Sequence, residues 1–304
     1  MLRILPNVDA ALRARAPVVA LESSVLAQGL PIPQNRDAAT RMLSAVERAG
    51  ATPAITAVAR GTPTIGLEPE ELARFLLRDG VRKVSARDIP FAVASGWDGA
   101  TTVAASLALA SLAGIEVFAT GGIGGVHLGA PYDESADLSE LARTPMIVVC
   151  AGAKSILDLP ATWERLESFG VPVIGYRTKE FPGFFSAETG IALDAVADSC
   201  DEIVRAYRAH RTLGRTQAML VVQPPPAKFA LALADVENAV RAAQHEAANQ
   251  GVSGAKLTPF LLAAVTRLTS GSSLDANLAL LEQNAALAGE LATMCAGGPG
   301  GPSR

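Results

Sequence analysis

The chain has 304 residues, of which 49% are hydrophobic, and its formal net charge is −4 at neutral pH. This size and apolar content are enough for one large α/β domain or two smaller ones, and the acidic balance without a basic block argues against a nucleic-acid partner. No apolar run reaches the roughly 20 residues of a membrane span, and no secretory signal pattern opens the chain, so we expect no membrane partner and a cytoplasmic location.

The first buried strand is expected at residues 17–21, and it places Glu22 at its carboxyl end. A carboxylate there is either a helix-capping or surface group or part of a site, because ligands bind at the carboxyl ends of strands in α/β sheets. We favour the second interpretation. Downstream, the apolar periodicity predicts a helix at residues 36–49, a strand at residues 52–60 and a helix at residues 68–78.

Lys83 lies in a short mixed-charge stretch, residues 83–88. This stretch is either a solvated turn or a place where a lysine and an arginine reach a phosphate, and its spacing does not separate the two. A long helix is expected to start at residues 99–103 and to end at Gly114. The hydroxyl groups at its start can cap the helix or meet a ligand. A strand at residues 115–119 follows.

The stretch after this strand, residues 120–137, is the most informative in the chain. It opens with a glycine-rich turn from Thr120 to His127, where small residues let a backbone approach a ligand closely. It continues into an acidic loop that contains Asp133 and Asp137. Two aspartates near a histidine could hold a hard cation, and a plain acidic surface loop is an equal alternative.

A lysine follows the next apolar strand. After a short helix at residues 138–143, this strand ends at Cys150 and leads through three small residues to Lys154. A lysine there is either a surface residue or a nucleophile, because partial burial lowers the pKa of an amine and makes its neutral form available. Such an amine attacks the anomeric carbon of a sugar to give a Schiff base, while Glu22 could protonate the departing ring oxygen. The iminium is an electron sink that helps to cleave an adjacent carbon–carbon bond.

In the remaining half of the chain, expected strands and helices again alternate. Its last helix carries Asn277 and Asn284 on an apolar face, and because asparagine is unfavourable inside a helix, we expect them to have partners. Alternating strands and helices without a repeat or linker predict one α/β sheet with helices on both faces. The expected elements are a helix at residues 155–169, a strand at 171–176, a helix at 199–210, a strand at 217–223, a helix at 233–250 and a helix from 254.

Three cysteines and the tail remain. Cys150, Cys200 and Cys295 match no zinc or CxxC spacing and fit free thiols in a reducing interior. Residues 297–304 consist almost only of glycine and proline, so we expect a flexible tail without a fold.

Six segments form an ordered set of motifs along the chain: ALESSVLAQGLPIPQN, GATTVAASLALASLAGIEVFATGGIGGVH, ESADLSEL, RTPMIVVCAGAKSILD, GVPVIGY and GAKLTPFLL. Long motifs in a fixed order are far more specific than a lone glycine pattern. The set resembles the pseudouridine-5′-phosphate glycosidase family, also called pseudouridylate synthase or indigoidine-synthase-A-like, over about residues 3–294.

The resemblance implies a three-layer α/β/α fold with a mixed central sheet, in a single domain over residues 1–296. It implies a homotrimer that acts on a small sugar-phosphate substrate. The implied reaction is the reversible cleavage of the carbon–carbon glycosidic bond of pseudouridine 5′-phosphate to uracil and ribose 5-phosphate. A lysine Schiff base and a divalent metal, typically Mn²⁺, belong to that reaction.

The resemblance also implies residue roles by motif position. Lys154 corresponds to the Schiff-base nucleophile, Glu22 to the proton donor and Asp133 to the metal ligand. The positions that correspond to substrate contacts are Lys83, the backbone of Val103, Ser135, Ala136, Asp137, Thr120, His127 and Asn277.

Three positions depart from the family pattern. Leu128 stands where an arginine is usual, Ala86 where a basic residue is common, and Glu134 where an isoleucine is usual. These changes leave the nucleophile and the acid untouched and bear on phosphate and metal binding. Two alternatives stay open: a Schiff-base aldolase that acts on another sugar phosphate, and a non-catalytic sugar-phosphate-binding protein.

Overall fold

A computed structural model describes residues 1–129, 132–252, 254 and 257–297. Its centre is a mixed sheet of 11 strands. Nine of them follow in the order β1-β4-β3-β2-β7-β9-β13-β11-β12, and the other two form a branch in which β6 pairs with β3 and β5 pairs with β6. Strands β8 and β10 form a separate two-stranded sheet. The strands are β1 (Arg3–Ile4), β2 (Val18–Leu21), β3 (Thr52–Ala59), β4 (Thr62–Ile65), β5 (Val81–Val84), β6 (Asp98–Thr101), β7 (Val117–Ala119), β8 (Val126–His127), β9 (Ile147–Cys150), β10 (Leu157–Asp158), β11 (Val173–Tyr176), β12 (Val196–Ala197) and β13 (Met219–Val222).

The middle of the sheet is parallel. β2 pairs with β3 and β7, β7 pairs with β9, and β9 pairs with β13, all in parallel. All residues of β2, β7, β9 and β13 are buried, because helices cover both faces of a parallel sheet. This is why they appear in the sequence as unbroken apolar runs. The carboxyl ends of these strands meet at one edge of the sheet.

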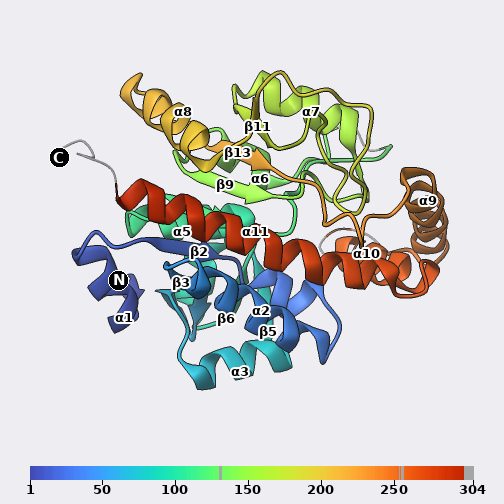
Figure 1. The fold of residues 1–304 in the computed structure, drawn as a ribbon. Coiled ribbons are helices and arrows are strands. Elements are labelled where there is room, and N and C mark those ends of the chain that lie inside the picture. Colours follow the sequence, from blue (N-terminus) through green and yellow to red (C-terminus); the bar gives the residue numbers. More distant parts are fainter. Residues whose placement is uncertain (130–131, 253, 255–256, 298–304) are drawn as a thin grey trace.

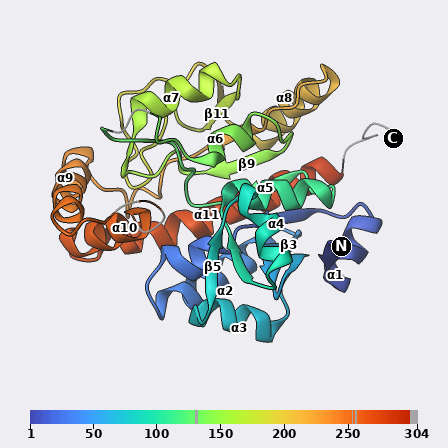
Figure 2. The same cartoon turned by 180° about the vertical axis from the view of Figure 1, so that it is seen from behind.

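Helices cover the two faces. α11 lies in front of the sheet in Figure 1, and α5 lies in front when the molecule is turned round (Figure 2). The predicted mixed α/β fold is therefore confirmed. The helices are α1 (Pro6–Arg13), η1 (Val25–Gly29), α2 (Gln34–Arg48), α3 (Pro69–Leu77), η2 (Ala86–Asp88), α4 (Ile89–Ala94), α5 (Val103–Leu112), α6 (Ala136–Leu141), α7 (Leu159–Ser168), α8 (Cys200–Thr212), α9 (Leu233–Asn249), α10 (Leu257–Leu268) and α11 (Ser272–Ala296).

The segment around β5 and β6 differs from the prediction. Lys83, for which a solvated turn was one of two open alternatives, lies in β5 and pairs with Ala100 of β6. Gly99, expected at the start of a helix, lies in β6, where a Cβ would come within 2.6 Å of Val84. The reason for both differences is long-range strand pairing, which local sequence does not encode. The predicted helix begins only at Val103.

Two smaller predictions are also corrected. The helix expected from residue 155 begins at Leu159, because residues 157–158 pair with β8 as β10. A short helix, α4, follows η2 and was not expected.

α11 spans the molecule. It packs on α2, on α8 and on strands β2, β7 and β9, so it is buried along much of its length. No helix in the described parts of the chain is long and apolar enough to cross a membrane. Except for Gly297, the predicted flexible tail lies outside the described residues, as do residues 130–131 of the acidic loop and residues 255–256 of the last motif.

Candidate active site

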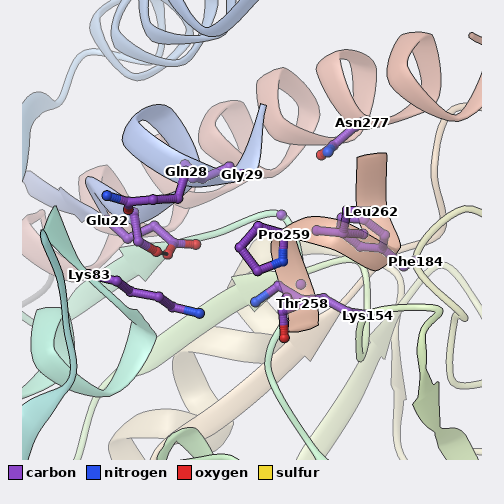
Figure 3. A pocket seen from close by; sticks show the side chains of 14 residues that line it. Glu22, Gln28, Gly29, Lys83, Lys154, Phe184, Thr258, Pro259, Leu262 and Asn277 are labelled. Carbon is purple, nitrogen blue, oxygen red and sulfur yellow. Dashed lines mark hydrogen bonds between the residues drawn. The ribbon is translucent and has the colours of Figure 1, made fainter. Parts of the chain in front are cut away.

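A cavity lies where three neighbouring strands end. Its empty volume, including the open mouth, is about 490 Å³. Glu22 follows β2, Gly121 and Gly122 follow β7, and Lys154 follows β9, and all four line the cavity. Glu22 and Lys154, far apart in the sequence, therefore share one space (Figure 3). The other lining residues are Ser24, Val25, Gln28, Gly29, Lys83, Phe184, Thr258, Pro259, Leu262 and Asn277.

Glu22 is held by two hydroxyl groups. The residue is only 3% exposed. Thr120 donates to its Oε1 at 2.5 Å and Ser24 donates to its Oε2 at 2.5 Å. Leu21 pairs with Ala119 in the parallel sheet, so the next residue of each strand, Glu22 and Thr120, come side by side. The carboxyl group is thus oriented from both sides.

A cluster of four buried hydroxyl groups lies directly behind Glu22. Ser23, Thr56, Thr101 and Ser106 are all 0% exposed. Ser23 Oγ donates to the carbonyl of Thr56 at 2.7 Å and accepts from the N–H of Thr101 at 2.9 Å. Thr56 Oγ1 lies 2.8 Å from Ser106 Oγ and 2.9 Å from Thr101 Oγ1. These contacts join the end of β2 to β3, β6 and α5, and so fix Glu22 relative to the start of α5.

Lys83 extends from β5 into the cavity (Figure 3). Burial of its ammonium lowers its pKa below the usual 10.5, Lys154 lowers it further, and Asp137 and Glu22 oppose this shift. Much of the side chain is nevertheless solvent-exposed, because the cavity is open at its mouth. Two amines that face one cavity form a place that favours an anion.

The loop that carries Lys154 is fixed to the glycine-rich turn. The N–H of Lys154 donates to the carbonyl of Ile123 at 3.0 Å, and the N–H of Ile123 donates to the carbonyl of Gly152 at 3.0 Å. Gly152 has a φ of +79°, and a Cβ there would lie 1.9 Å from the carbonyl oxygen of Pro182. Only glycine fits this position. Lys154 itself is half-buried.

The glycine-rich turn forms the floor of the cavity. A Cβ at Gly122 would lie 2.6 Å from the ring of Phe184, and one at Gly124 would lie 2.3 Å from Ser135 Oγ. Side chains at these positions would push the turn away from its neighbours. These glycines, which were expected to let a ligand approach the backbone, therefore also serve close packing.

Asp137 lies behind this turn. Its Oδ1 accepts from the N–H of Ala104 at 2.9 Å, and its Oδ2 accepts from the N–H of Gly124 at 2.8 Å. The residue is 4% exposed and joins the turn to the first turn of α5, where a carboxylate is favourable. Both carboxylate oxygens are thereby used within the protein.

Several predicted contact residues do not line this cavity. Val103 is buried at the start of α5, Ser135 caps α6, and Ala136 is exposed. Thr120 contacts Glu22 rather than the open space. His127 lines a neighbouring hollow between the β8 loop and helices α9 and α10. Their roles in substrate binding, and that of Asp137, stay predictions.

The predicted metal residues are only partly brought together. His127 Nδ1 lies 3.2 Å from Asp133 Oδ2, whereas Asp137 is engaged elsewhere. In the described part of the chain, no group of three or more histidine, cysteine or acidic side chains could share a metal ion. The pair fits a cation that completes its shell with water or substrate oxygens, as hard cations often do.

Glu134, which departs from the family pattern, has a structural partner. Its carboxylate lies 2.7 Å from Nε of Arg165 and accepts from Nη2 of the same residue at 3.0 Å. The Arg165 guanidinium also lies over the ring of Phe169, 4.4 Å from its centroid. This ion pair holds the acidic loop against α7. Of the other two departures, Leu128 is 42% exposed beside the neighbouring hollow and Ala86 opens η2.

Two amide residues that line the cavity have buried oxygens that receive no hydrogen bond from the described residues: Gln28 Oε1 and Asn277 Oδ1. Asn277 lines the cavity, as the resemblance implied, but among the described residues its Oδ1 lacks the hydrogen-bond partner expected from its place on an apolar helix face, and its role in substrate binding stays a prediction. Gln28 was missed, as were Ser24 and Thr258, whereas Phe184 belongs to an aromatic cluster, residues 181–185, that either covers a pocket or serves packing. Gln28, Ser24 and Thr258 share one signal, which is their place in a matching segment: Gln28 and Ser24 lie in the first and Thr258 in the last.

Comparisons with known proteins identify the relatives of this chain. The family model of indigoidine synthase A like proteins matches residues 7–294. The pseudouridine-5′-phosphate glycosidase of Gemmatimonas aurantiaca is 63% identical over 290 residues, 95% of each chain. Its counterpart in Escherichia coli is 49% identical over 296 residues, 96% of this chain and 95% of the relative.

Two solved structures share the fold. The prealnumycin C-glycosynthase AlnA in complex with ribulose 5-phosphate has a TM-score of 0.90 at 37% identity, with 97% of both chains covered. An indigoidine synthase A-like protein from Thermotoga maritima has a TM-score of 0.89 at 34% identity, again with 97% of both chains covered.

Proposed function

The chain belongs to the indigoidine synthase A like family, and we propose that it works through a lysine Schiff base. Its reaction is the reversible cleavage of the carbon–carbon glycosidic bond of pseudouridine 5′-phosphate, which gives uracil and ribose 5-phosphate. Relatives at 63% and 49% identity carry this activity in their name, and AlnA was solved with another pentose phosphate. The observation that carries the mechanism is the cavity that Glu22 and Lys154 share.

Ring opening is the first chemical step. Lys154 gives up a proton, which reaches the Glu22 carboxylate through solvent in the cavity, and the neutral amine attacks the anomeric carbon. The bond between this carbon and the ring oxygen breaks, and Glu22 returns the proton to that oxygen. Thr120 and Ser24 keep the carboxyl group in place during this transfer.

Cleavage of the carbon–carbon bond follows. The nitrogen now joined to the anomeric carbon loses its second proton to Glu22, and its lone pair expels uracil. Carbon 5 of uracil takes that proton, and the nitrogen becomes an iminium. In this proposal the Schiff base forms as the bond breaks, whereas the order expected from the sequence placed the Schiff base before the cleavage. Water then releases ribose 5-phosphate and restores Lys154.

The other cavity residues suit binding of the two halves of the substrate. Lys83 supplies a cation for the 5′-phosphate. Asn277 and Gln28 offer amide oxygens without partners in the described residues, which suit the N–H groups of uracil.

We also propose a divalent cation, Mn²⁺, held by Asp133 and His127. When bound, it would supply positive charge that polarises the oxygens around it. A homotrimer and a cytoplasmic location complete the proposal; the free thiols of all three cysteines support the latter. Light scattering of the purified protein tests the trimer.

Borohydride trapping tests the mechanism. Incubation with ribose 5-phosphate and reduction should give one adduct on Lys154, located by peptide mass spectrometry, and Lys154→Ala should abolish turnover while the protein stays folded. An adduct at another residue would contradict the mechanism. Consumption of uracil in the presence of ribose 5-phosphate separates the glycosidase from an aldolase, and ligand binding without turnover would indicate a binding protein.

A further inference from the structure

Asn284 connects α11 with the glycine-rich turn, although it does not line the cavity. It lies in the middle of the helix and is only 1% exposed. Its Nδ2 donates to the carbonyl of Thr120 at 2.8 Å and lies 3.3 Å from the carbonyl of Gly121. Its Oδ1 accepts from Nε2 of Gln223 at 3.0 Å. The side chain is therefore fully used on both sides.

These bonds act where the sheet ladder ends. The N–H of Thr120 still donates to Val149 of the adjacent strand, and the carbonyl of Gly121 still accepts from Ala151. Asn284 donates to the Thr120 carbonyl between these two ladder bonds, so that this buried acceptor is satisfied without a strand partner. The same Thr120 donates through its hydroxyl to Glu22 at 2.5 Å. A single residue thus separates Asn284 from the acid.

The orientation of the Asn284 amide is set by the carbonyls of Thr120 and Gly121, and a chain of amides agrees with it. Gln283 donates through Nε2 to Oε1 of Gln223 at 2.9 Å, which leaves Nε2 of Gln223 directed at Asn284 Oδ1. If the Asn284 amide were flipped, its Oδ1 would face the carbonyl oxygens of Thr120 and Gly121, and its Nδ2 would face Nε2 of Gln223. Acceptors would then meet acceptors, and a donor would meet a donor. Asparagine is also a poor residue for a helix interior, so packing alone does not explain it.

We propose that Asn284 is a positioning residue: it holds the backbone of Thr120 and Gly121 so that Thr120 keeps the carboxyl of Glu22 directed at the ring oxygen of the sugar. This inference rests on the proposed function. Asn284 does not contact the substrate, so its effect on the reaction passes through Thr120.

Asn284→Asp is the most direct test. Aspartate keeps the shape and the acceptor for Gln223 and replaces both donors by an oxygen that faces two carbonyl oxygens. Leu291→Ala is the control, because Leu291 is also buried in α11 but lies seven residues, about 10 Å, further along the helix. Both variants remove buried interactions, so both should lower the free energy of unfolding. Urea unfolding of the two variants measures how closely these losses of stability match.

The readouts separate positioning from stability. With pseudouridine 5′-phosphate, Asn284→Asp should lower kcat by about 10- to 100-fold with KM within about threefold of wild type, the size expected for a displaced general acid. Leu291→Ala should keep kcat within about twofold. Equal kcat values in the two variants would overturn the inference.

A structural readout keeps the inference testable if the wild type fails to cleave pseudouridine 5′-phosphate, which would refute the proposed function instead. Crystal structures of the wild type and Asn284→Asp should differ at the contact between Thr120 Oγ1 and Glu22 Oε1. An unchanged carboxyl position in the variant would overturn the positioning role whatever the substrate.

Discussion

Replacing Gly152 by alanine tests how firmly the loop that carries Lys154 is held. Gly152 has a φ of +79°, and a Cβ there would lie 1.9 Å from the carbonyl oxygen of Pro182 and 2.9 Å from the carbonyl carbon. Gly190 is a matched control, because its φ is +77° and no described atom lies within 4 Å of its Cβ position. Both substitutions place an alanine at a positive φ, and only Gly152→Ala brings the new Cβ into collision with the Pro182 carbonyl.

The magnitudes follow from this difference. A left-handed conformation costs an L-residue roughly 1–2 kcal/mol, which is the loss of unfolding free energy expected for Gly190→Ala. Overpacking adds roughly 1–3 kcal/mol, so Gly152→Ala should lose about 2–5 kcal/mol. Because Cβ atoms essentially never approach closer than 3.0 Å, residue 152 and the Pro182 carbonyl must move apart. Displacement of a reacting group by about 1 Å can lower a rate about 100-fold.

Two assays check this prediction. Urea unfolding gives the stability of each variant, and borohydride trapping with ribose 5-phosphate gives the reactivity of Lys154. We expect Gly190→Ala to trap at the wild-type rate and Gly152→Ala to trap far more slowly. If both variants lose the same stability and trap equally fast, the backbone around Gly152 yields freely and the argument for a fixed lysine is wrong.

Three further predictions concern charged groups. Affinity for ribose 5-phosphate should fall as pH rises through the lowered pKa of Lys83, because only its ammonium form attracts phosphate. Calorimetry in a pH series should show a weaker fall for Lys83→Met than for the wild type. An identical fall in both proteins would refute this prediction. Asp137→Asn should lower the unfolding free energy in urea by about 1.5–3 kcal/mol, because one of the N–H groups of Ala104 and Gly124 loses its acceptor; an unchanged value would refute it. Asp133→Asn should weaken Mn²⁺ binding at least about tenfold by calorimetry, with the exposed Asp79→Asn unchanged as control.

The parallel centre of the sheet could be predicted because it leaves a local signature. Strands β2 and β9 are buried on both faces, so they stand out as apolar runs, and each leads to a polar residue of the site, Glu22 or Lys154. Local sequence alone therefore indicates both residues of the proposed acid–nucleophile pair.

The β5–β6 edge could not be predicted in the same way. Its strands contain charged residues and a glycine, and they become strands only because β6 pairs with β3. Lys83 owes its place in the cavity to this long-range pairing. The partners of Asp137 were equally hidden, because an aspartate in an acidic loop gives no local sign that its carboxylate accepts from the amides of Ala104 and Gly124.

The order of strands β2, β7 and β9 is consistent with the proposal that Glu22 as acid and Lys154 as nucleophile act on one bond. Neighbouring strands are about 4.8 Å apart, so the backbones before Glu22 and Lys154 are separated by roughly 10 Å. An in-line displacement at the anomeric carbon needs about 7 Å between nucleophile and acid, since an attack distance of about 3 Å and a hydrogen bond of about 2.7 Å lie on either side of the breaking bond. This geometry requires that the strand between them carry no bulk at its end, and Gly121 and Gly122 meet that requirement, because both line the cavity without a side chain.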